Sequence, residues 1–419
     1  MKARVNRFGL WCALMGFTLL VLAGCGGGGG SGGSSPTTTG TSLAANVQEL
    51  VVDSGPAGMT TRVVNTAYTS VRICVPGTNN CQTIDHVLVD TGSTGLRLLA
   101  SALTLPLPQQ LVASNPLYNC IQFIDRSYVW GNVAQADLYM GGTALDGRKA
   151  ANLPIQLISA GAPSVTCTSN GSGMARSTVD SLGANGILGV SPYLQDCGSI
   201  CTTNSGNGTY YVNTGSSNYA GTTASLAEQL QQPVSKMPQD NNGVVISLPA
   251  VAGSASSLSG TLTLGIATQS NNQLGSASVL GLDASGYFNT DLSGSFSALG
   301  LLGFLDTGSN GLFFGMPSPV YCTGSTSWYC PSIARTIQAT NTGTNSQSIS
   351  ANFTVQDVNA LLTTASVSAI EALSGPAPSG LGATGYFDFG LPFFYGRKVF
   401  TAIQNGIPIG VYTTPFVAY

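Results

Sequence analysis

The chain has 419 residues, a formal net charge of -3 and only 7% charged residues. It is long enough for two or three domains of ordinary size, and its 43% hydrophobic content is sufficient for a large buried core. No cluster of Lys and Arg follows the first few residues, which excludes nucleic-acid binding through a basic surface. Val, Ile, Thr, Tyr and Phe are frequent and are interrupted by Gly, Asn and Ser, a pattern that predicts a mainly β protein.

Residues 1–24 have the features of an export signal. Basic residues come first, and the apolar residues 8–23 that follow form a stretch too short to span a membrane comfortably. The stretch ends in Leu-Ala-Gly-Cys, which resembles the lipobox of bacterial lipoproteins. This resemblance implies that residues 1–24 are removed, that Cys25 carries lipid, and that the chain is anchored in the bacterial cell envelope, periplasmic or at the outer membrane. The alternative is an ordinary signal peptide that happens to contain a Cys.

A tether is expected over residues 25–46. Residues 26–40 are almost all Gly, Ser and Thr with one Pro, a composition that offers nothing to bury and predicts a flexible linker.

The cysteines that follow Cys25 in the exported chain are expected to form disulfides, because an even number of Cys in an exported chain is typical of a disulfide framework. Spacing favours three close pairs and leaves a fourth, although sequence alone does not fix the connectivity. A metal site is not expected, since no Cys-x-x-Cys is present and His86 is the only His. The suggested pairs are Cys74 with Cys81, Cys197 with Cys201, Cys322 with Cys330, and Cys120 with Cys167.

One motif occurs twice. The chain reads HVLVDTGSTGLRLL around Asp90 and LGFLDTGSNGLFF around Asp306. Each copy has an apolar run, then Asp-Thr-Gly-Ser, one variable residue, Gly-Leu and a second apolar run. A single copy could be an ordinary turn, because Asp-x-Gly suits tight turns. Two copies in the same context indicate a duplicated functional element.

A pair of carboxyls at such a duplicated turn suits hydrolysis by an activated water. One group must take a proton from the water and another must protonate the carbonyl oxygen. Two carboxylates about 3 Å apart cannot both ionise easily, so they share a proton. Glycines let the backbone approach the carboxyls, serines can donate hydrogen bonds to them, and threonines can lock the turns together. The supporting residues are Thr91, Gly92, Ser93, Thr307, Gly308 and Ser309.

With these two turns the sequence resembles the pepsin-like aspartic peptidases. Other segments resemble parts of that family: a hairpin leading to the first Asp, two apolar-apolar-Gly crossings, a helix with its following strand, and the strand opening a second lobe. The resemblance implies a two-lobed fold with pseudo-twofold symmetry, with lobes at 47–245 and 246–419 and Asp90 and Asp306 as the catalytic pair in a cleft. The segments are 71–90, 185–190, 387–403, 225–248 and 260–265.

The chain also looks like an uncharacterised family of bacterial exported lipoproteins. The segments DTGSTGLRLL, ANGILGV, DTGSNGLFF and GLPFFYGR carry this second resemblance. It implies no assigned substrate.

The hairpin that covers the substrate in pepsin-like enzymes is where the sequence departs from the family. The nearest segment is 123–142, where Trp130-Gly131 occupies the place of the family's Tyr-Gly step and Tyr128 lies two residues earlier. An indole N–H could replace a phenol at the tip of an otherwise apolar side chain. Trp130 and Tyr128 are therefore the flap candidates, with cross-strand packing as the alternative role.

The sequence predicts an aspartic endopeptidase that acts as a monomer, without a cofactor, on a peptide or protein substrate. A single His leaves no Ser-His-Asp or Cys-His pair to build. The competing hypothesis is a non-catalytic envelope or surface binding protein on the same fold, since fold does not imply activity. A third hypothesis, prompted by the low charge, is a structural component of an extracellular appendage.

Replacing Cys25 by Ser tests the anchor. We expect the variant to lose incorporation of a fatty-acid analogue and to leave the membrane fraction, because the thiol is the acceptor of the lipid. Labelling that persists in the variant would show that Cys25 is not the lipidated residue.

Overall fold

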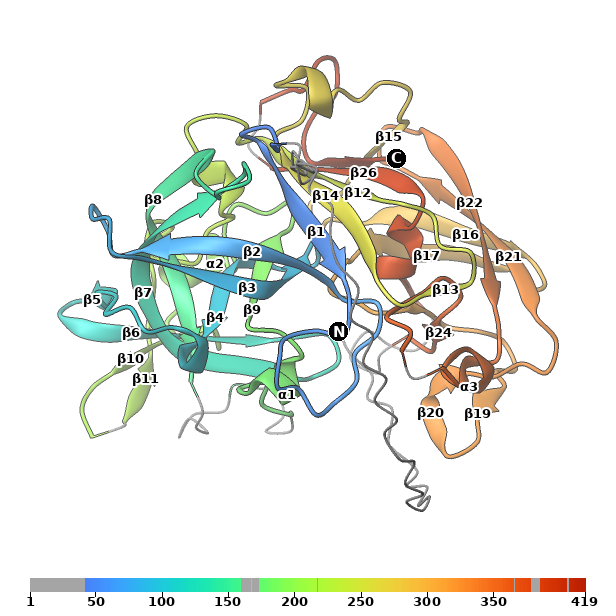
Figure 1. The fold of residues 1–419 in the computed structure, drawn as a ribbon, viewed down its shortest axis with the longest axis horizontal. Helices are drawn as coiled ribbons and strands as arrows, with labels where there is room; N and C mark the ends of the chain where they lie inside the picture. The colour runs from blue at the N-terminus through green and yellow to red at the C-terminus, as the bar shows by residue number, and fades with distance from the viewer. Residues whose placement is uncertain are drawn as a thin grey trace, which may run out of the picture.

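A computed structural model describes residues 42–159, 167, 173–216, 218–364, 366–377, 385–404 and 407–419. The predicted signal peptide, Cys25 and the Gly-rich part of the tether lie outside the described residues. The described chain is mainly β, which confirms the prediction of a mainly β protein (Figure 1).

The larger sheet in the described chain is 16-stranded and collects strands from both ends of the sequence. Its order is β11-β10-β6-β7-β8-β4-β9-β3-β2-β1-β14-β12-β26-β27-β15, with β5 attached to β6. The strands are β1 (Val47–Val52), β2 (Ala67–Cys74), β3 (Cys81–Asp90), β4 (Thr94–Leu99), β5 (Leu111–Val112), β6 (Asn115–Gln122), β7 (Tyr128–Met140), β8 (Arg148–Ile158), β9 (Gly186–Val190), β10 (Tyr210–Asn213), β11 (Tyr219–Gly221), β12 (Gly243–Leu248), β14 (Leu258–Leu264), β15 (Val279–Gly281), β26 (Arg397–Ala402) and β27 (Phe416–Ala418).

Part of this sheet closes on itself. Strands β2, β3, β9, β4, β8 and β7 follow one another, and β7 pairs again with β2. Val71, Val89, Leu98, Leu138 and Leu188 from these strands are all fully buried in one core cluster. Strands β4 and β9 are buried at every position, which indicates that both faces of the barrel wall are covered there.

The second large sheet is 7-stranded in the described chain, with order β22-β21-β16-β17-β25-β18-β24. In Figure 1 it lies to the right, the barrel lies to the left, and β1, β14, β12 and β26 run between them. The strands are β16 (Phe288–Gly294), β17 (Ala298–Leu305), β18 (Leu312–Phe314), β21 (Arg335–Thr342), β22 (Ser348–Val355), β24 (Ser374–Gly375) and β25 (Tyr386–Phe389). Two short ribbons pair β13 (Ser254–Ala255) with β23 (Ala369–Ile370), and β19 (Tyr321–Cys322) with β20 (Ser325–Tyr329).

Helices in the described residues are single turns. No described helix has the length and apolar character needed to cross a membrane. They are α1 (Val179–Leu182), α2 (Ile200–Thr203) and α3 (Val358–Leu361), with 3₁₀ turns at Ala100–Ala102, Val234–Lys236, Ser270–Asn272 and Leu391–Phe394.

The strands around the two repeated motifs are arranged in the same way. Strand β3 ends at Asp90 and pairs in parallel with β9, which also pairs antiparallel with the returning strand β4. Strand β17 ends one residue before Asp306 and pairs in parallel with β25, which pairs antiparallel with β18. The apolar-apolar-Gly segments therefore run between the two arms of each motif.

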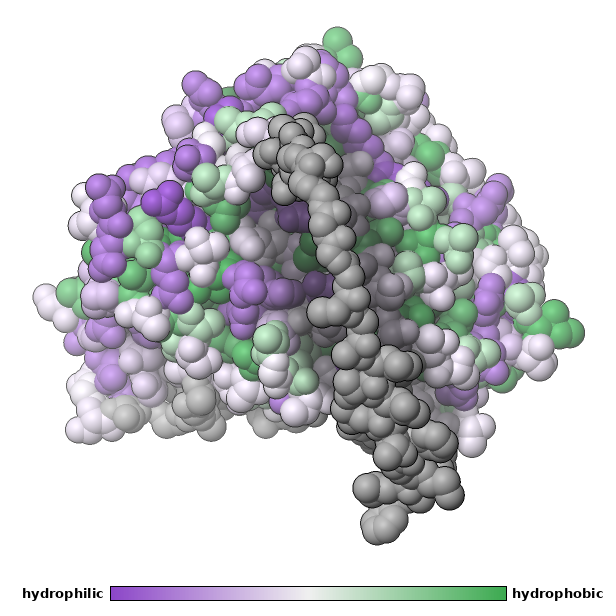
Figure 2. Space-filling model, in the orientation of Figure 1, coloured by the Kyte–Doolittle hydropathy of each residue, from purple (hydrophilic) through white to green (hydrophobic). Residues whose placement is uncertain are grey.

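The packing beneath the second motif is aromatic. The rings of Phe314 and Phe387 are stacked at 4.9 Å, and those of Phe387 and Phe389 at 3.9 Å. On the surface, hydrophilic, neutral and apolar patches are interspersed over the face shown in Figure 2, without one continuous apolar area. This distribution matches a chain rich in Gly, Ser and Thr and poor in charge.

All four suggested cysteine pairs are disulfides in the structure. Cys74 and Cys81 are also direct cross-strand partners at the end of the β2–β3 hairpin. The other bridges are Cys120–Cys167, Cys197–Cys201 and Cys322–Cys330. The boundary between two lobes that the sequence predicts after residue 245 stays a prediction. This position lies inside β12, which pairs with both β14 and β26.

His86 connects strand β3 to the segment after β1. Its Nε2 lies 3.2 Å from Asp53 Oδ2 and its Nδ1 lies 3.0 Å from Asp85 Oδ2. The hydrogen bond to Asp53 is the main cause that raises the pKa of His86, while burial opposes it. A raised pKa in the folded state means that the ion pairs stabilise the fold below the ordinary His pKa, and that this contribution is lost as pH rises through the raised value.

Replacing His86 by Asn tests this contribution, and Asn tolerates the positive φ of 46° at this position. We expect the parent to be more stable than the variant, with a difference in free energy of unfolding that is up to about 1 kcal/mol larger at pH ~5.5 than at pH ~8.5. The effect is small because the ion pair is partly exposed and therefore screened by solvent. Denaturant unfolding at both pH values measures the difference. A pH-independent difference would show that the His86 charge contributes nothing.

Candidate active site

The two Asp-Thr-Gly-Ser turns contact each other through their threonines. Thr91 Oγ1 donates to Leu305 O at 2.9 Å and accepts from Thr307 N at 3.0 Å. Thr307 Oγ1 donates to Val89 O at 2.8 Å and accepts from Thr91 N at 3.1 Å. The threonines are 216 residues apart in the sequence and are both buried. Each side chain thus hydrogen-bonds the backbone of the other motif, as the sequence analysis expected.

The first turn holds the Asp90 carboxyl from its own residues. Gly92 N donates to Asp90 Oδ1 at 2.8 Å, and Ser93 Oγ donates to Asp90 Oδ2 at 2.6 Å. Asp90 is only 6% exposed. Both oxygens therefore have fixed donors although the group is almost removed from solvent.

The second turn holds Asp306 in the same way. Gly308 N donates to Asp306 Oδ1 at 2.7 Å, and Ser309 Oγ lies 2.9 Å from Asp306 Oδ2. The exposed fraction of Asp306 is 4%. Ser309 differs from Ser93 in one respect, because its Oγ also lies 2.6 Å from Oδ2 of a third carboxyl, Asp388.

The two predicted carboxyls meet. A Cβ built on Gly92 would lie 2.7 Å from Asp306 Cγ, and one built on Gly308 would lie 2.7 Å from Asp90 Oδ1. These approaches are too close for any side chain at either glycine. The two carboxyl groups are therefore close neighbours, and each influences the protonation of the other. The structure therefore places the eight residues of the repeated motif at one point.

Burial is the main cause that raises the pKa of Asp90, to about 7, and the neighbouring charge of Asp306 adds to it. The hydrogen bond from Ser93 opposes the shift but does not cancel it. A proton is therefore retained on the pair over the acidic range and up to about neutral pH.

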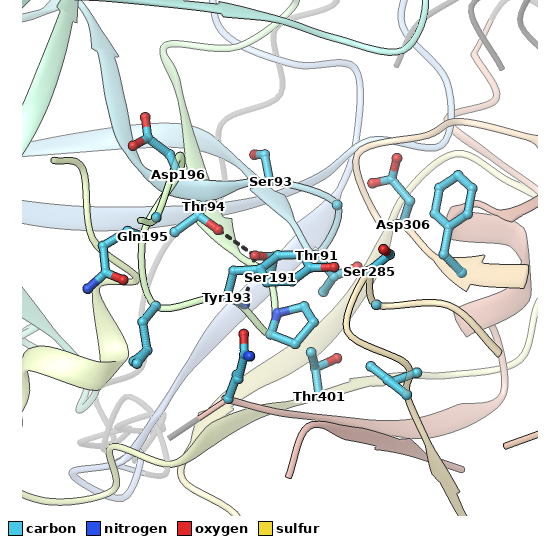
Figure 3. A pocket seen from close by; sticks show the side chains of 18 of the residues that line it. Thr91, Ser93, Thr94, Ser191, Tyr193, Gln195, Asp196, Ser285, Asp306 and Thr401 are labelled. Atoms are coloured by element: carbon cyan, nitrogen blue, oxygen red, sulfur yellow. Dashed lines mark hydrogen bonds between the residues drawn. The ribbon is translucent and has the colours of Figure 1, made fainter. Parts of the chain in front are cut away.

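A cavity of about 780 Å³ opens over the turns. Its lining includes Thr91, Ser93 and Asp306 from the repeated motifs, with Tyr193 and Tyr287 from two loops. Figure 3 shows Asp306 toward one side of this cavity and Asp196 toward the other, with Thr94 hydrogen-bonded to Ser191 between them. The volume is in the range of small-molecule and peptide sites.

Sequence reasoning missed two buried charged groups near the pair. Arg97, in the strand after the first turn, is fully buried, and its Nη2 lies 3.2 Å from Asp196 Oδ2. Asp388 is 1% exposed on β25. The signal for both was a charged residue inside an otherwise apolar run, in TGLRLL and in FDFG.

The flap candidates do not reach the cavity. Trp130 is 4% exposed and packs against the rings of Tyr118, Tyr211 and Tyr219, so cross-strand packing is the role that its surroundings support. Tyr128 lies at the edge of this aromatic cluster. Neither residue lines the cavity described above.

The tip of the same β6–β7 hairpin does reach the site. Phe123 lines the large cavity, and with Asp125 it also lines a smaller one of about 50 Å³ that contains Asp90 and Asp306. The residues that line this smaller cavity with the two carboxyls therefore lie at the hairpin tip, five to seven residues earlier in the sequence than Trp130.

A group of three possible metal ligands occurs elsewhere among the described residues, at Cys322, Cys330 and Asp357. The two cysteines are joined in a disulfide, so they offer no thiolate to a metal.

Comparison with known families matches residues 42–419 to the family described as "Protein of unknown function (DUF3443)". The chain belongs to this family. The match covers the described fold and both Asp-Thr-Gly-Ser turns, and the family's description assigns no activity to them. No curated protein matches the chain.

Replacing Thr91 by Val tests the lock between the turns. The variant leaves Leu305 O and Thr307 N without their buried partner, so we expect the free energy of unfolding to fall by about 2–4 kcal/mol. Thr91→Ser keeps the hydroxyl and is expected to lose less than about 1.5 kcal/mol. Denaturant unfolding with unchanged m-values provides the measurement. Equal losses in both variants would show that packing, and not the hydrogen bonds, holds the turns together.

Proposed function

We propose that this family member is an aspartic endopeptidase of the pepsin-like type, with Asp90 and Asp306 as its catalytic pair. The observation that carries the proposal is the contact between two buried carboxyls, each with its own backbone and serine donors, at the edge of an open cavity. Such a pair shares one proton, which is the state needed to act as acid and base together.

The proposal includes the two-lobed pepsin-like fold. It is supported by the matching strand arrangement around Asp90 and Asp306, in which β9 and β25 play equivalent parts. The reciprocal threonine hydrogen bonds lie where a pseudo-twofold axis between the two motifs would pass.

In the mechanism, the pair shares one proton, because burial and the charge of Asp306 raise the pKa of Asp90. The reaction starts from the microstate in which Asp90 carries this proton. A water held between the carboxyls gives one proton to Asp306, and its oxygen attacks the peptide carbonyl carbon. Asp90 donates its proton to the carbonyl oxygen, which gives a gem-diol. The amide nitrogen then takes the proton from Asp306, the C–N bond breaks, and a diol proton returns to Asp90.

A peptide is the substrate class that this site favours. The cavity is lined by aromatic and short polar side chains, with Tyr193 and Tyr287 available to pack against apolar side chains of a substrate. Apart from the catalytic pair, the buried charges at its wall, Arg97 and Asp196, neutralise each other. We therefore expect the site to select peptide substrates by their apolar side chains and by hydrogen bonds to their backbone, and not by their charge.

The proposed enzyme acts as a monomer at the cell envelope, attached to a membrane through the lipid on Cys25. This part of the proposal is supported by the lipobox-like sequence and the flexible tether, together with the disulfides, which form in oxidising compartments.

Asp90→Asn and Asp306→Asn test the function in the purified full-length mature protein. Each variant keeps the shape of the site but removes one partner of the shared proton, so we expect cleavage of a diverse peptide pool to fall by at least about 100-fold. Asp146→Asn makes the same chemical change at an exposed position and should cleave like the parent. A statine-type transition-state analogue should inhibit the parent.

The pH dependence gives an independent check. Parent activity should follow a bell and should decline as pH rises through about 7, because the pair then loses its shared proton. An Asn variant as active as the parent would remove the dyad. A parent that binds the statine-type analogue but cleaves nothing between about pH 3 and 8 would favour the non-catalytic binding protein.

A further inference from the structure

Ser309 lies between two carboxyls, that of Asp306 directly after β17 and that of Asp388 on β25. Its Oγ lies 2.9 Å from Asp306 Oδ2 and 2.6 Å from Asp388 Oδ2. A serine hydroxyl has one hydrogen to donate, so it can donate to one of these oxygens only. The other contact is a hydrogen bond only if that carboxyl is protonated and donates to Ser309 Oγ.

Asp388 is the carboxyl whose surroundings fit the protonated form. It is 1% exposed, and its Oδ1 has no hydrogen-bond partner within the described part of the chain. An ionised carboxylate in such a position would be buried without enough donors, which is costly. Asp306 is better supplied for the ionised form, because Gly308 N donates to its Oδ1.

The equivalent position in the first motif supports this assignment. In the register of the sheet, Asp388 pairs with Phe313, and the corresponding pair in the first motif is Ile187 with Arg97. The buried charge of Arg97 is neutralised by Asp196. Asp388 has no basic residue beside it among the described residues that act on it, so a proton is the means left to neutralise it.

We propose that Asp388 is a positioning residue that holds its proton and donates it to Ser309, so that Ser309 directs its single hydrogen to Asp306. This inference rests on the proposed function, because it describes how one member of the catalytic pair is kept ionised and in place. The relay runs from Asp388 through Ser309 to Asp306, and each hydrogen bond polarises the next.

The charges that act on Asp388 agree with this relay. Asp306 and Asp90 are the charged side chains in the described chain that influence it, and both favour its neutral form. Burial is the largest cause that raises the pKa of Asp388 well above the ordinary aspartate range, and the contact with Ser309 only partly offsets it.

The protonation state can be measured without any activity. In protein labelled with ¹³C at the Asp carboxyl, the Asp388 resonance is the one that Asp388→Asn removes. We expect it to stay at the position of a protonated acid at pH ~7, far above the ordinary aspartate pKa of about 3.9. A resonance that moves to the carboxylate position near pH ~4 would overturn the proposal.

Two variants then test the positioning role through the pH profile of kcat/KM. Asp388→Asn keeps a donor toward Ser309, so we expect both limbs of the bell to stay within about 0.3 pH units of the parent. Asp388→Ile copies the residue found at Ile187 and removes the donor. Its acid limb should move up by about 0.5–1 unit, since ionised Asp306 then loses support, and kcat should fall with little change in KM.

If Asp388 is ionised instead of protonated, the limbs of the pH profile shift in the opposite direction. If Asp388 were ionised, removing its negative charge in either variant would move both limbs down in pH, because repulsion of the pair would be relieved. Shifts in that direction would refute the proposal. Asp146→Asn serves again as the matched control and should shift neither limb.

Failure of this inference is distinguishable from failure of the proposed function. A parent that cleaves peptides but has an ionised Asp388 refutes only the relay. A parent that cleaves nothing refutes the peptidase, while the ¹³C titration still decides whether Asp388 holds its proton. If Asp388→Ile does not fold, the Asn variant and the titration remain decisive.

Discussion

The reciprocal hydrogen bonds between Thr91 and Thr307 are the constraint on which the site depends. They join two turns that are far apart in the sequence, and they do so through buried backbone groups that would be costly to leave unpaired. With the turns fixed, Asp90 and Asp306 have little freedom to separate. Their closeness, together with burial, raises the pKa of Asp90, so the shared proton follows from the backbone arrangement.

The two halves of the site are equivalent in backbone but differ in charge. The first motif carries a buried cation, Arg97, which Asp196 neutralises. The second carries a buried acid, Asp388, which contacts Ser309 and has no cation among the described groups that act on it. A duplicated element can thus supply two carboxyls of the same geometry in different electrostatic surroundings. Such a difference lets one carboxyl act as acid and the other as base.

Sequence reasoning reached the features that local patterns determine. The repeated motif predicted both turns with their supporting residues, alternation predicted a mainly β fold, and cysteine spacing suggested the four disulfides. It left open the roles that side-chain direction decides. Trp130 was a flap candidate with cross-strand packing as the alternative, and its contacts with Tyr118 and Tyr219 support the packing role. Asp388 sits in a run that reads as apolar, and its contact with Ser309 depends on pairing between strands distant in sequence.

The central claim is that Asp90 and Asp306 hold one reactive water between them. A crystal structure of the protein bound to a statine-type analogue tests it most directly, because the hydroxyl of the analogue takes the place of that water. The account predicts this hydroxyl within hydrogen-bond distance, about 2.5–3.0 Å, of both carboxyls. An analogue bound elsewhere, or carboxyls more than about 6 Å apart and so unable to share a proton, would contradict it.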